Sequence, residues 1–346
     1  MYFKIKKRLD KELSVFIKGI DRSYALKKLS PILSKEIKGF VRRKGKRLRP
    51  ILFIVGYLGF AKTVADNLYR SALSLELLHD FLLIHDDIID KSDMRRGKPS
   101  LHKKFDGYLS GHKGIKFAGV DLAIVAGDII YAIAIDSFLS IKENAVRKEK
   151  ALKNFLQTTI YTGAGEFVEL LAGIKDIKNI RKSDIYKIYD LKTAFYSFAS
   201  PLSTGAILAG ASNAEVKKLN KSAIYLGEAF QIKDDILGMF AEENEIGKPS
   251  ITDLREGKKT ILIWYAYHNA KKSDKNYIRY ILSKKKVGRA DLYKMRRILT
   301  ESGALSYAQK EISILADRGL RLLDASRMRP KYKAFLLDYS RNLLKI

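Results

Sequence analysis

The sequence contains no cysteine and few prolines, and each scarcity limits the structures that the chain can form. Without cysteine the chain forms no disulfide, no zinc–thiolate or iron–sulfur site and no thiol nucleophile. Six prolines in 346 residues allow long, uninterrupted helices. Hydrophobic residues make up 47% of the chain, which excludes a disordered protein and is enough for a sizeable core.

Long hydrophobic segments are also scarce. The opening residues MYFKIKKRLDKELSVF are charged throughout and lack the apolar core of a signal peptide. The longest uninterrupted apolar run, residues 50–61, is too short to cross a bilayer as a helix. We therefore predict a cytoplasmic protein.

Acidic residues are scarce relative to basic ones. The formal net charge is +28, and the first fifty residues hold 17 Lys or Arg against 4 Asp or Glu. Such a field favours nucleic acid, anionic membrane surfaces or phosphorylated small substrates. A solvated, lysine-rich surface is the plain alternative.

Apolar residues recur at three- and four-residue spacing, and strict alternation is rare. This pattern predicts helices over residues 122–139, 185–208 and 224–240. Turn-forming stretches at 210–215 and 283–289 separate such segments. With no repeat or low-complexity linker, we expect one all-α domain covering residues 1–346.

A first acidic cluster stands in the apolar segment ELLHDFLLIHDDIID. On a helix, Asp86 and Asp90 lie on one face, and Asp87 is rotated about a quarter turn away. Carboxylates crowded among apolar residues need a counter-charge, and oxygen ligands suit Mg²⁺. A helix end with surface acids is the alternative interpretation.

A second cluster, FQIKDDILG, repeats this arrangement. Asp234 and Asp235 are adjacent, and Gln231 precedes Asp234 by one turn. Two such clusters facing each other across a cavity would hold two or three metal ions and so receive a diphosphate. The pair is a stronger indication than either cluster alone.

Basic segments accompany these clusters. Lys46 and Arg49, in GKRLRP, are three residues apart and project together onto one anion from a loop or first helical turn. Basic loops with Gly and Pro follow each acidic cluster: DMRRGKP and GKPSITDLREGKKT. A metal ion on one side of a phosphorylated substrate and Arg or Lys on its other side would bind it well. Each loop taken alone is more simply interpreted as a solvated turn.

Together these motifs resemble the trans-isoprenyl diphosphate synthases, or polyprenyl synthetases, and most closely the archaeal-type geranylgeranyl diphosphate synthases. The match extends from about residue 45 to 260 and includes VAGD, ending at Asp128, and LKTA, containing Lys192 and Thr193. It implies an all-α bundle of ten or more helices around a central cavity (the isoprenoid synthase fold). It also implies a homodimer and joining of isopentenyl diphosphate to an allylic diphosphate.

The resemblance assigns a role to each matching position. By this resemblance, two or three Mg²⁺ ions are bound by Asp86, Asp87, Asp90, Asp234 and Asp235. Isopentenyl diphosphate is bound by Lys46, Arg49, His79 and Arg96. The allylic diphosphate is bound by Arg95, Lys192, Thr193, Gln231, Lys248 and Lys258. Of these, the expected catalytic residues are Arg95, Lys192, Gln231 and Lys258. His79 lies seven residues before Asp86 and so shares its face, which favours a site over a structural role.

The sequence departs from the family pattern at two places. The second acidic motif usually ends in a third aspartate, where this chain has Gly238. Glu166 and Glu169 replace the Gln and Asp of another family segment, which we interpret as variation because both stay polar.

Product length depends on what blocks the growing tail. In the family a bulky residue five positions before the first aspartate forms the floor, and here that residue is Phe81. Leu82 follows instead of a second aromatic, which favours a twenty-carbon product. Helical spacing alone places Leu78 and Leu82 more directly behind Asp86.

Four alternatives stay open on the sequence. They are a fifteen-carbon (farnesyl) or mixed C15/C20 synthase, a non-catalytic subunit of a heteromeric synthase, a terpene cyclase and a nucleic-acid-binding protein. The last rests on charge alone, so we expect no nucleic-acid partner. Weak docking to anionic membrane would suit a greasy product.

Overall fold

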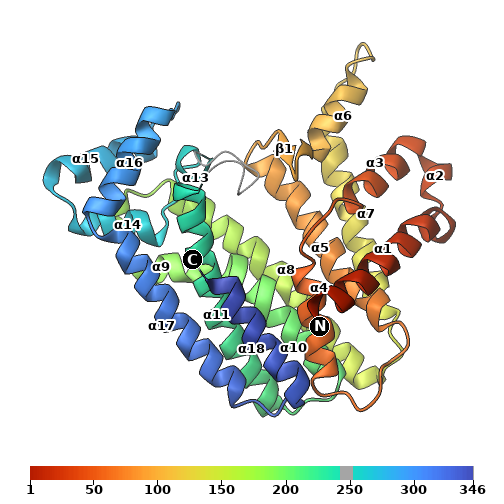
Figure 1. Cartoon of the computed structure of the whole chain (residues 1–346). Helices are drawn as coiled ribbons and strands as arrows, with labels where there is room; N and C mark the ends of the chain where they lie inside the picture. Colours follow the sequence, from red (N-terminus) through yellow and green to blue (C-terminus); the bar gives the residue numbers. More distant parts are fainter. Residues whose placement is uncertain (242–251, 346) are drawn as a thin grey trace. The chain divides into compact units, whose positions relative to one another are not determined.

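The computed structural model describes residues 1–241 and 252–345, whose regular secondary structure is helical apart from one short hairpin (Figure 1). The predicted all-α class is confirmed. The chain forms two compact units: residues 1–152 with 205–210, and residues 153–204 with 211–346. We call them unit 1 and unit 2. A single domain remains a prediction.

Unit 1 holds the N-terminal helices and the hairpin. Its elements are α1 (Tyr2–Tyr24), α2 (Leu26–Leu29), α3 (Pro31–Val41), α4 (Leu48–Leu58), α5 (Leu68–Ile89), β1 (Met94–Arg95), β2 (Lys98–Pro99), α6 (Leu101–Leu109) and α7 (Gly119–Leu139). Two helices have residues in both units: α8 (Ala145–Gly173) and α10 (Ser200–Leu208).

The packing of α5 against α7 forms the centre of unit 1. Gly127 makes this approach possible, because a Cβ there would lie 2.7 Å from His85 Cε1. Helix α7 is also the one helix among the described residues that is long and apolar enough to cross a membrane. One such helix is weak evidence of a span, since a core helix passes the same test. Here α7 packs on α5 and α6 and carries three aspartates, so we interpret it as a core helix.

Unit 2 is built around one long helix, α11, which packs against α17 and η2. Its elements are η1 (Ile177–Asn179), α9 (Lys182–Tyr189), η2 (Asp190–Ala199), α11 (Asn213–Phe240), α13 (Thr252–Arg255), α14 (Ile261–Asn269), α15 (Lys272–Ser283), α16 (Arg289–Glu301), α17 (Ala304–Asp324) and α18 (Pro330–Leu344). Side-chain caps begin two of these helices. Ser212 accepts a hydrogen bond from the backbone N–H of Glu215 at the start of α11, and Thr260 does the same for Ile263 at α14.

The segment predicted as helix over residues 185–208 is helical but not uniform. It consists of α9, the ten-residue π-helix η2 and α10. In η2 the hydrogen bonds join residues five apart, as between the Ser200 N–H and the Phe195 carbonyl. Such wide turns are rare and occur frequently at functional sites. The three- and four-residue spacing of apolar residues predicted a helix here but did not predict this change of helix type.

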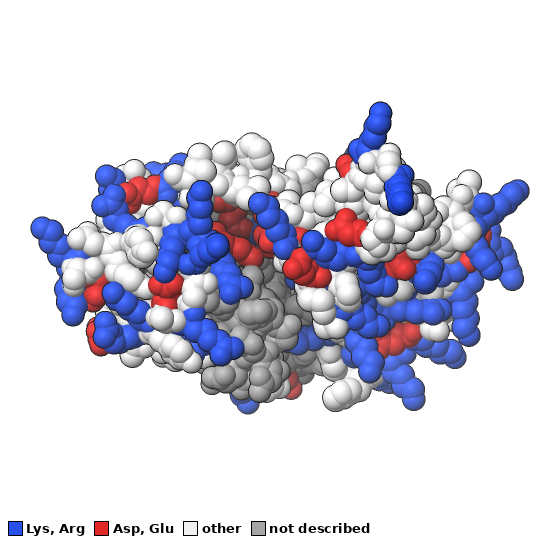
Figure 2. Space-filling model, turned by 90° about the horizontal axis from the view of Figure 1, so that it is seen from above, with Lys and Arg blue, Asp and Glu red and all other residues white. Residues whose placement is uncertain are grey.

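The excess basic residues spread over the surface. On the face drawn in Figure 2, Lys and Arg side chains are scattered among Asp, Glu and uncharged residues. On this face, among the described residues, the distribution agrees with a solvated surface.

Candidate active site

The first acidic cluster lies at the C-terminal end of α5. Asp86 and Asp90 stand one turn apart and are partly buried, whereas Asp87 is fully buried. One oxygen of Asp87, Oδ2, has no hydrogen-bond partner among the described residues. Burial raises the pKa of Asp87 to about 6, although the nearby Arg95 acts in the opposite direction. The end of α5 thus presents one buried carboxylate oxygen, Asp87 Oδ2, without a hydrogen-bond partner among the described residues.

The hairpin after α5 brings two arginines to this cluster. Arg96 and Gly97 form its two-residue turn, with φ of 53° and 70°. Positive φ at both positions is typical of the type I′ turn that suits a tight hairpin. The Arg95 guanidinium donates to Asp87 Oδ1 at 2.6 Å and to Asp86 Oδ2 at 3.0 Å.

Arg96 points to a different pair of acids. Its guanidinium lies 3.6 Å from Glu76 and 3.7 Å from Asp80, both buried on α5. Neither oxygen of Asp80 has a hydrogen-bond partner among the described residues, and burial raises the pKa of Asp80 well above its usual range. The sequence analysis did not single out Glu76 or Asp80. The available signal was their spacing: Glu76 and Asp80 are four residues apart and share one face of α5, and Glu76 stands three residues before His79.

The GKRLRP loop packs against this arginine. A Cβ on Gly45 would lie 3.4 Å from Arg96 Nη2, so glycine allows the close approach. Lys46 is exposed in the loop, and Arg49 is partly buried in the first turn of α4. One of the two residues between them, Arg47, is buried and pairs with Glu76 at 2.5 Å. Arg47 therefore has a structural partner and the two predicted residues flank it.

His79 joins the same group on α5. Burial and the neighbouring guanidinium groups, Arg49 first, lower the pKa of His79 well below its usual value. The imidazole is therefore neutral and donates one N–H. Unit 1 thus brings together Arg49, His79 and Arg96, with Arg95 on the acidic cluster beside them.

The other predicted residues meet in unit 2, where η2 packs against α11. Thr193 donates its hydroxyl hydrogen to Gln231 Oε1 at 2.6 Å, and Gln231 Nε2 donates to Asp235 Oδ1 at 2.8 Å. Tyr189 donates to the other oxygen of Asp235, which is buried. Asp234, by contrast, is exposed. The second cluster therefore has one fixed and one accessible carboxylate.

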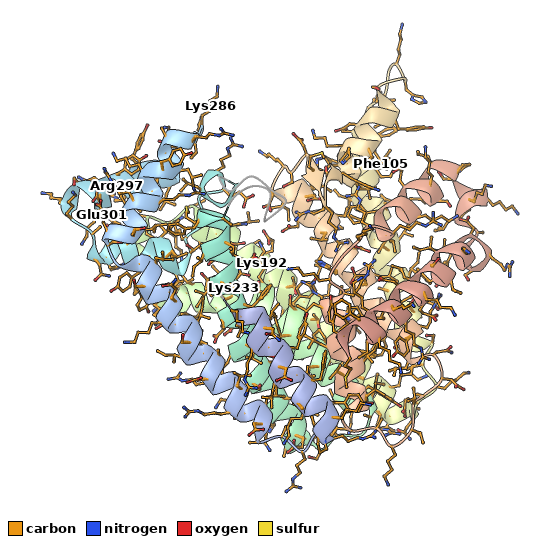
Figure 3. The ribbon with its side chains drawn as sticks, in the orientation of Figure 1. Phe105, Lys192, Lys233, Lys286, Arg297 and Glu301 are labelled. Atoms are coloured by element: carbon orange, nitrogen blue, oxygen red, sulfur yellow. The ribbon has the colours of Figure 1, made fainter. Side chains whose placement is uncertain are left out.

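Lys192, labelled in Figure 3, projects from η2 toward α8. Its ammonium group lies 2.5 Å from carboxylate oxygens of both Glu166 and Glu169. Gly165 permits the contact between the two helices, since a Cβ there would lie 2.8 Å from the Lys192 backbone nitrogen. We interpreted the two glutamates as variation, but the structure makes them direct partners of a predicted site lysine.

Two predicted lysines follow the second cluster in sequence. Lys258 pairs with Glu256 at 2.6 Å, just before the Thr260 cap of α14. Lys248 lies outside the described residues. Gly238, which stands where the family has its third aspartate, is buried on α11.

Carboxylate groups beside fixed guanidinium and ammonium groups suit a diphosphate bound together with a divalent metal ion. Comparison with known proteins leads to the same kind of site. Residues 30–299 match the polyprenyl synthetase family. The chain belongs to this family. It is a trans-prenyltransferase, an enzyme that condenses isopentenyl diphosphate with an allylic diphosphate.

Several individual proteins of this family are similar to the chain. The prenyltransferase is 33% identical over 266 residues to a geranylgeranyl diphosphate synthase of Sulfolobus acidocaldarius, covering 76% of this chain and 75% of that one. It is 32% identical to a geranylfarnesyl diphosphate synthase of Aeropyrum pernix, covering 82% and 84%. Its fold matches a geranylgeranyl pyrophosphate synthase of Corynebacterium glutamicum, solved with isoprenyl diphosphate and magnesium. That match has a TM-score of 0.90 and 25% identity, and it covers 100% and 99% of the chains.

Phe81, the residue expected to limit product length in this prenyltransferase, lies on α5 and is partly buried. Its ring stacks on Tyr131 of α7, with centroids 4.9 Å apart and planes at 26°. Leu82 is also partly buried, whereas Leu78 is fully buried. The stacked pair therefore joins α5 to α7 five residues before Asp86.

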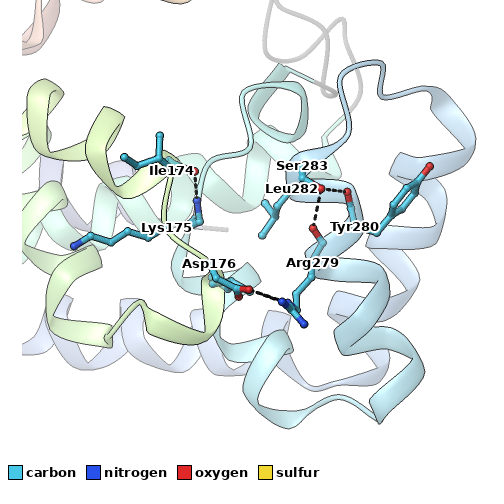
Figure 4. A pocket seen from close by; sticks show the side chains of 10 residues that line it. Ile174, Lys175, Asp176, Arg279, Tyr280, Leu282 and Ser283 are labelled. Atoms are coloured by element: carbon cyan, nitrogen blue, oxygen red, sulfur yellow. Dashed lines mark hydrogen bonds and ion pairs between the residues drawn. The ribbon is translucent and has the colours of Figure 1, made fainter.

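A cleft of about 500 Å³ in unit 2 contains none of the predicted site residues (Figure 4). Two of its cations are already engaged. Lys259 donates to the carbonyls of Ala172 and Gly173 at 2.9 and 2.8 Å, and Arg279 pairs with Asp176 at 2.6 Å. The prenyltransferase site is therefore described by the acidic clusters and their basic partners, not by this cleft.

Proposed function

We propose that this prenyltransferase makes geranylgeranyl diphosphate, a twenty-carbon product, in a magnesium-dependent reaction. The single observation that carries the chemistry is the position of Arg95 and Arg96 beside the acidic end of α5. Arg95 contacts Asp86 and Asp87, and Arg96 faces Glu76 and Asp80. Fixed guanidinium groups next to oxygen ligands suit a metal-bound diphosphate.

The chain's donor set fits magnesium. The candidate ligands Asp86, Asp87, Asp90, Asp234 and Asp235 offer only hard oxygen atoms, and Asp87 Oδ2 has no partner among the described residues. When bound, magnesium neutralises the allylic diphosphate and makes it a better leaving group. Because Gln231 and Tyr189 already fix Asp235, Asp234 is the more available ligand of the second cluster.

The basic residues divide the substrates between them. Lys46, Arg49, His79 and Arg96 bind isopentenyl diphosphate in this proposal. Arg95, Lys192, Thr193, Gln231, Lys248 and Lys258 bind the allylic diphosphate. Among the latter, Arg95, Lys192 and Lys258 share the negative charge that develops on the leaving diphosphate. No side chain stands out as a dedicated base, so the released pyrophosphate accepts the proton that is lost.

The stacked pair of Phe81 and Tyr131 supports a limit on chain length. A growing prenyl tail that meets two aromatic rings stops earlier than one that meets leucines. The named relatives make twenty- and twenty-five-carbon products, so the longer product is a competing outcome together with the fifteen-carbon one.

An exposed apolar stripe on α8 supports a homodimer. Ile160 is 66% exposed and Phe167 65%, and Leu170, Leu171 and Ile174 beyond them are exposed as well. The spacing of 160, 167 and 171 places these side chains along one face of the helix, and Ile174 follows directly after its end. A face of this kind marks a protein interface, and a second copy of the chain is the partner we propose for it.

The loop between α6 and α7 supports weak contact with anionic membrane. Ile115 and Phe117 in the loop, and Tyr108 in the last turn of α6, are each between 41% and 49% exposed. Lys113 and Lys116 alternate with them, and no acidic residue stands between Asp106 and Asp121. Apolar side chains interleaved with lysine suit a surface of anionic lipid.

One experiment tests the reaction. Purified protein is incubated with isopentenyl diphosphate and each allylic primer (C5, C10, C15), with Mg²⁺ or with EDTA, and products are separated by chromatography. We expect a C20 diphosphate that forms only with Mg²⁺. A C15 or C25 product would refute the chain length but not the reaction. No elongation in a folded sample would favour the non-catalytic subunit, for which Gly238 is the supporting observation.

A further inference from the structure

Two acidic side chains meet inside unit 2, where η2 begins against α11. Asp190 is the first residue of η2, and Glu228 lies on α11 with only 7% of its surface exposed. Their carboxyl groups are hydrogen-bonded to each other. Asp190 Oδ1 is buried and has no hydrogen-bond partner among the described residues. Because two ionised carboxylates offer only acceptors, this hydrogen bond requires a proton on one of them.

The surroundings keep that proton in place. Burial, followed by the charge of Asp190, raises the pKa of Glu228 to about 9, and burial raises the pKa of Asp190 as well. From α17, Glu311 adds negative charge and Arg318 acts in the opposite direction. Glu311 is itself held by two residues of α9, Lys182 at 2.9 Å and Tyr186 at 2.5 Å. At neutral pH the pair therefore carries one shared proton.

This pair stands immediately beside the proposed allylic site. Lys192 and Thr193 follow Asp190 by two and three residues, and Gln231 follows Glu228 by three. The helices touch between these points, since a Cβ on Gly227 would lie 2.5 Å from Ala194 Cα. A π-helix is the less stable of the helical forms, so its register depends on such contacts.

We propose that Asp190 and Glu228 are a positioning pair, whose shared proton holds the first turn of η2 in register on α11. The pair thereby sets where Lys192 and Thr193 meet the allylic diphosphate, and this role rests on the proposed function. Loss of the proton leaves two buried negative charges in contact. Their repulsion separates η2 from α11 and moves Thr193 away from Gln231.

The pH dependence has a definite sign. The folded protein holds the proton up to about pH 9, whereas an unfolded glutamic acid releases it near its usual pKa. Between these two pH values the folded state binds more protons than the unfolded state. The free energy of unfolding therefore decreases as the pH rises. Glu228→Gln keeps a hydrogen-bond donor at that position but removes the titration.

The test compares wild type with Glu228→Gln by two measurements. Thermal unfolding without ligand is followed from pH 6 to 9.5. Affinity for geranyl diphosphate with Mg²⁺ is measured by titration calorimetry at pH 7 and 9.5. Glu301→Gln, an exposed glutamate of α16, is the charge control, and Asp190→Asn replaces Glu228→Gln if the latter does not fold.

We expect the melting temperature of wild type to fall roughly 3–6 °C further than that of Glu228→Gln over this pH range. We also expect wild type to lose about fivefold or more in affinity at pH 9.5, and Glu228→Gln to lose less than about twofold. Glu301→Gln should behave as wild type in both measurements.

Three results would overturn parts of this proposal. Identical pH dependence of unfolding in the two proteins would show that the pair holds no proton. A difference in unfolding without a difference in affinity would refute the positioning role. If geranyl diphosphate binds neither protein, the proposed function and the positioning role fail together, while the unfolding data still decide whether the proton is shared.

Discussion

Thr193 of η2 donates its hydroxyl hydrogen to Gln231 of α11 at 2.6 Å. This hydrogen bond joins two residues assigned to the allylic diphosphate, 38 positions apart in the sequence. It also orients the Gln231 amide, whose nitrogen donates to Asp235. The π-helix thus reaches the second acidic cluster through two hydrogen bonds in series.

Replacing Thr193 with valine should weaken the allylic site without unfolding the protein. Valine keeps the side-chain shape but removes the donor to Gln231 Oε1, so that only the hydrogen bond to Asp235 orients the Gln231 amide. We expect the KM for the allylic primer to rise about tenfold, as for the loss of one hydrogen bond of ~1.4 kcal/mol. The KM for isopentenyl diphosphate should stay the same. Thr193→Ser, which retains the hydroxyl, is the matched control, and an equal loss in both variants would argue against the hydrogen bond.

Replacing Phe81 with alanine should lengthen the product. Removal of one ring of the Phe81–Tyr131 stack opens space one turn above the first acidic cluster. Chromatography of the products should show a shift from C20 toward C25 or longer chains. Leu82→Ala provides a comparison on the same helix. An unchanged distribution in Phe81→Ala would remove Phe81 from this role.

Replacing Glu76 with glutamine should destabilise unit 1. Glu76 is buried and pairs with Arg47, which is also buried, and it faces Arg96. The substitution removes the buried one of the two acidic partners of Arg47 and leaves only the partly exposed Asp10 at 3.1 Å, which costs about 3 kcal/mol. Chemical denaturation should report this loss. Asp338→Asn removes a partner of the exposed Arg341 and should change stability by less than about 0.5 kcal/mol.

Charges on the α8 stripe should disrupt the proposed homodimer. Phe167→Glu with Leu171→Glu places two negative charges on an apolar face that is exposed within one chain. Light scattering after size-exclusion chromatography should give a dimer for wild type and a monomer for the double variant. Lys310→Glu, which changes an exposed residue of α17, should leave the assembly intact. A monomeric wild type would refute the dimer.

Reversing the charge of the α6–α7 loop should reduce membrane binding. Lys113→Glu with Lys116→Glu opposes attraction to anionic lipid, which contributes about 1 kcal/mol per basic residue. Co-sedimentation with vesicles containing phosphatidylserine should fall about tenfold or more in the double variant. Vesicles of neutral lipid should bind both proteins equally weakly. Wild-type binding that does not depend on anionic lipid would exclude this interaction.

The sequence by itself determined the fold class and the reaction. Spacing of three and four residues predicted the helices, because a buried helical face imposes that period on apolar residues. The acidic clusters and GKRLRP identified the family, because metal and diphosphate chemistry requires particular residue types at particular spacings. The predicted groups of residues also came together locally: Arg49, His79 and Arg96 in unit 1, and Thr193, Gln231 and Asp235 in unit 2.

Only the tertiary structure decided which groups are partners. On the sequence, Glu166 and Glu169 were interpreted as variation, but α8 places them on Lys192. Arg47 had no assigned role on the sequence, but it is buried and pairs with Glu76. The contact between Asp190 and Glu228 was likewise invisible, as was the π-helix that Asp190 begins. The physical reason is that spacing reports only which residues share one helix face. Partners on different helices, and the burial that shifts a pKa, depend on how those helices pack.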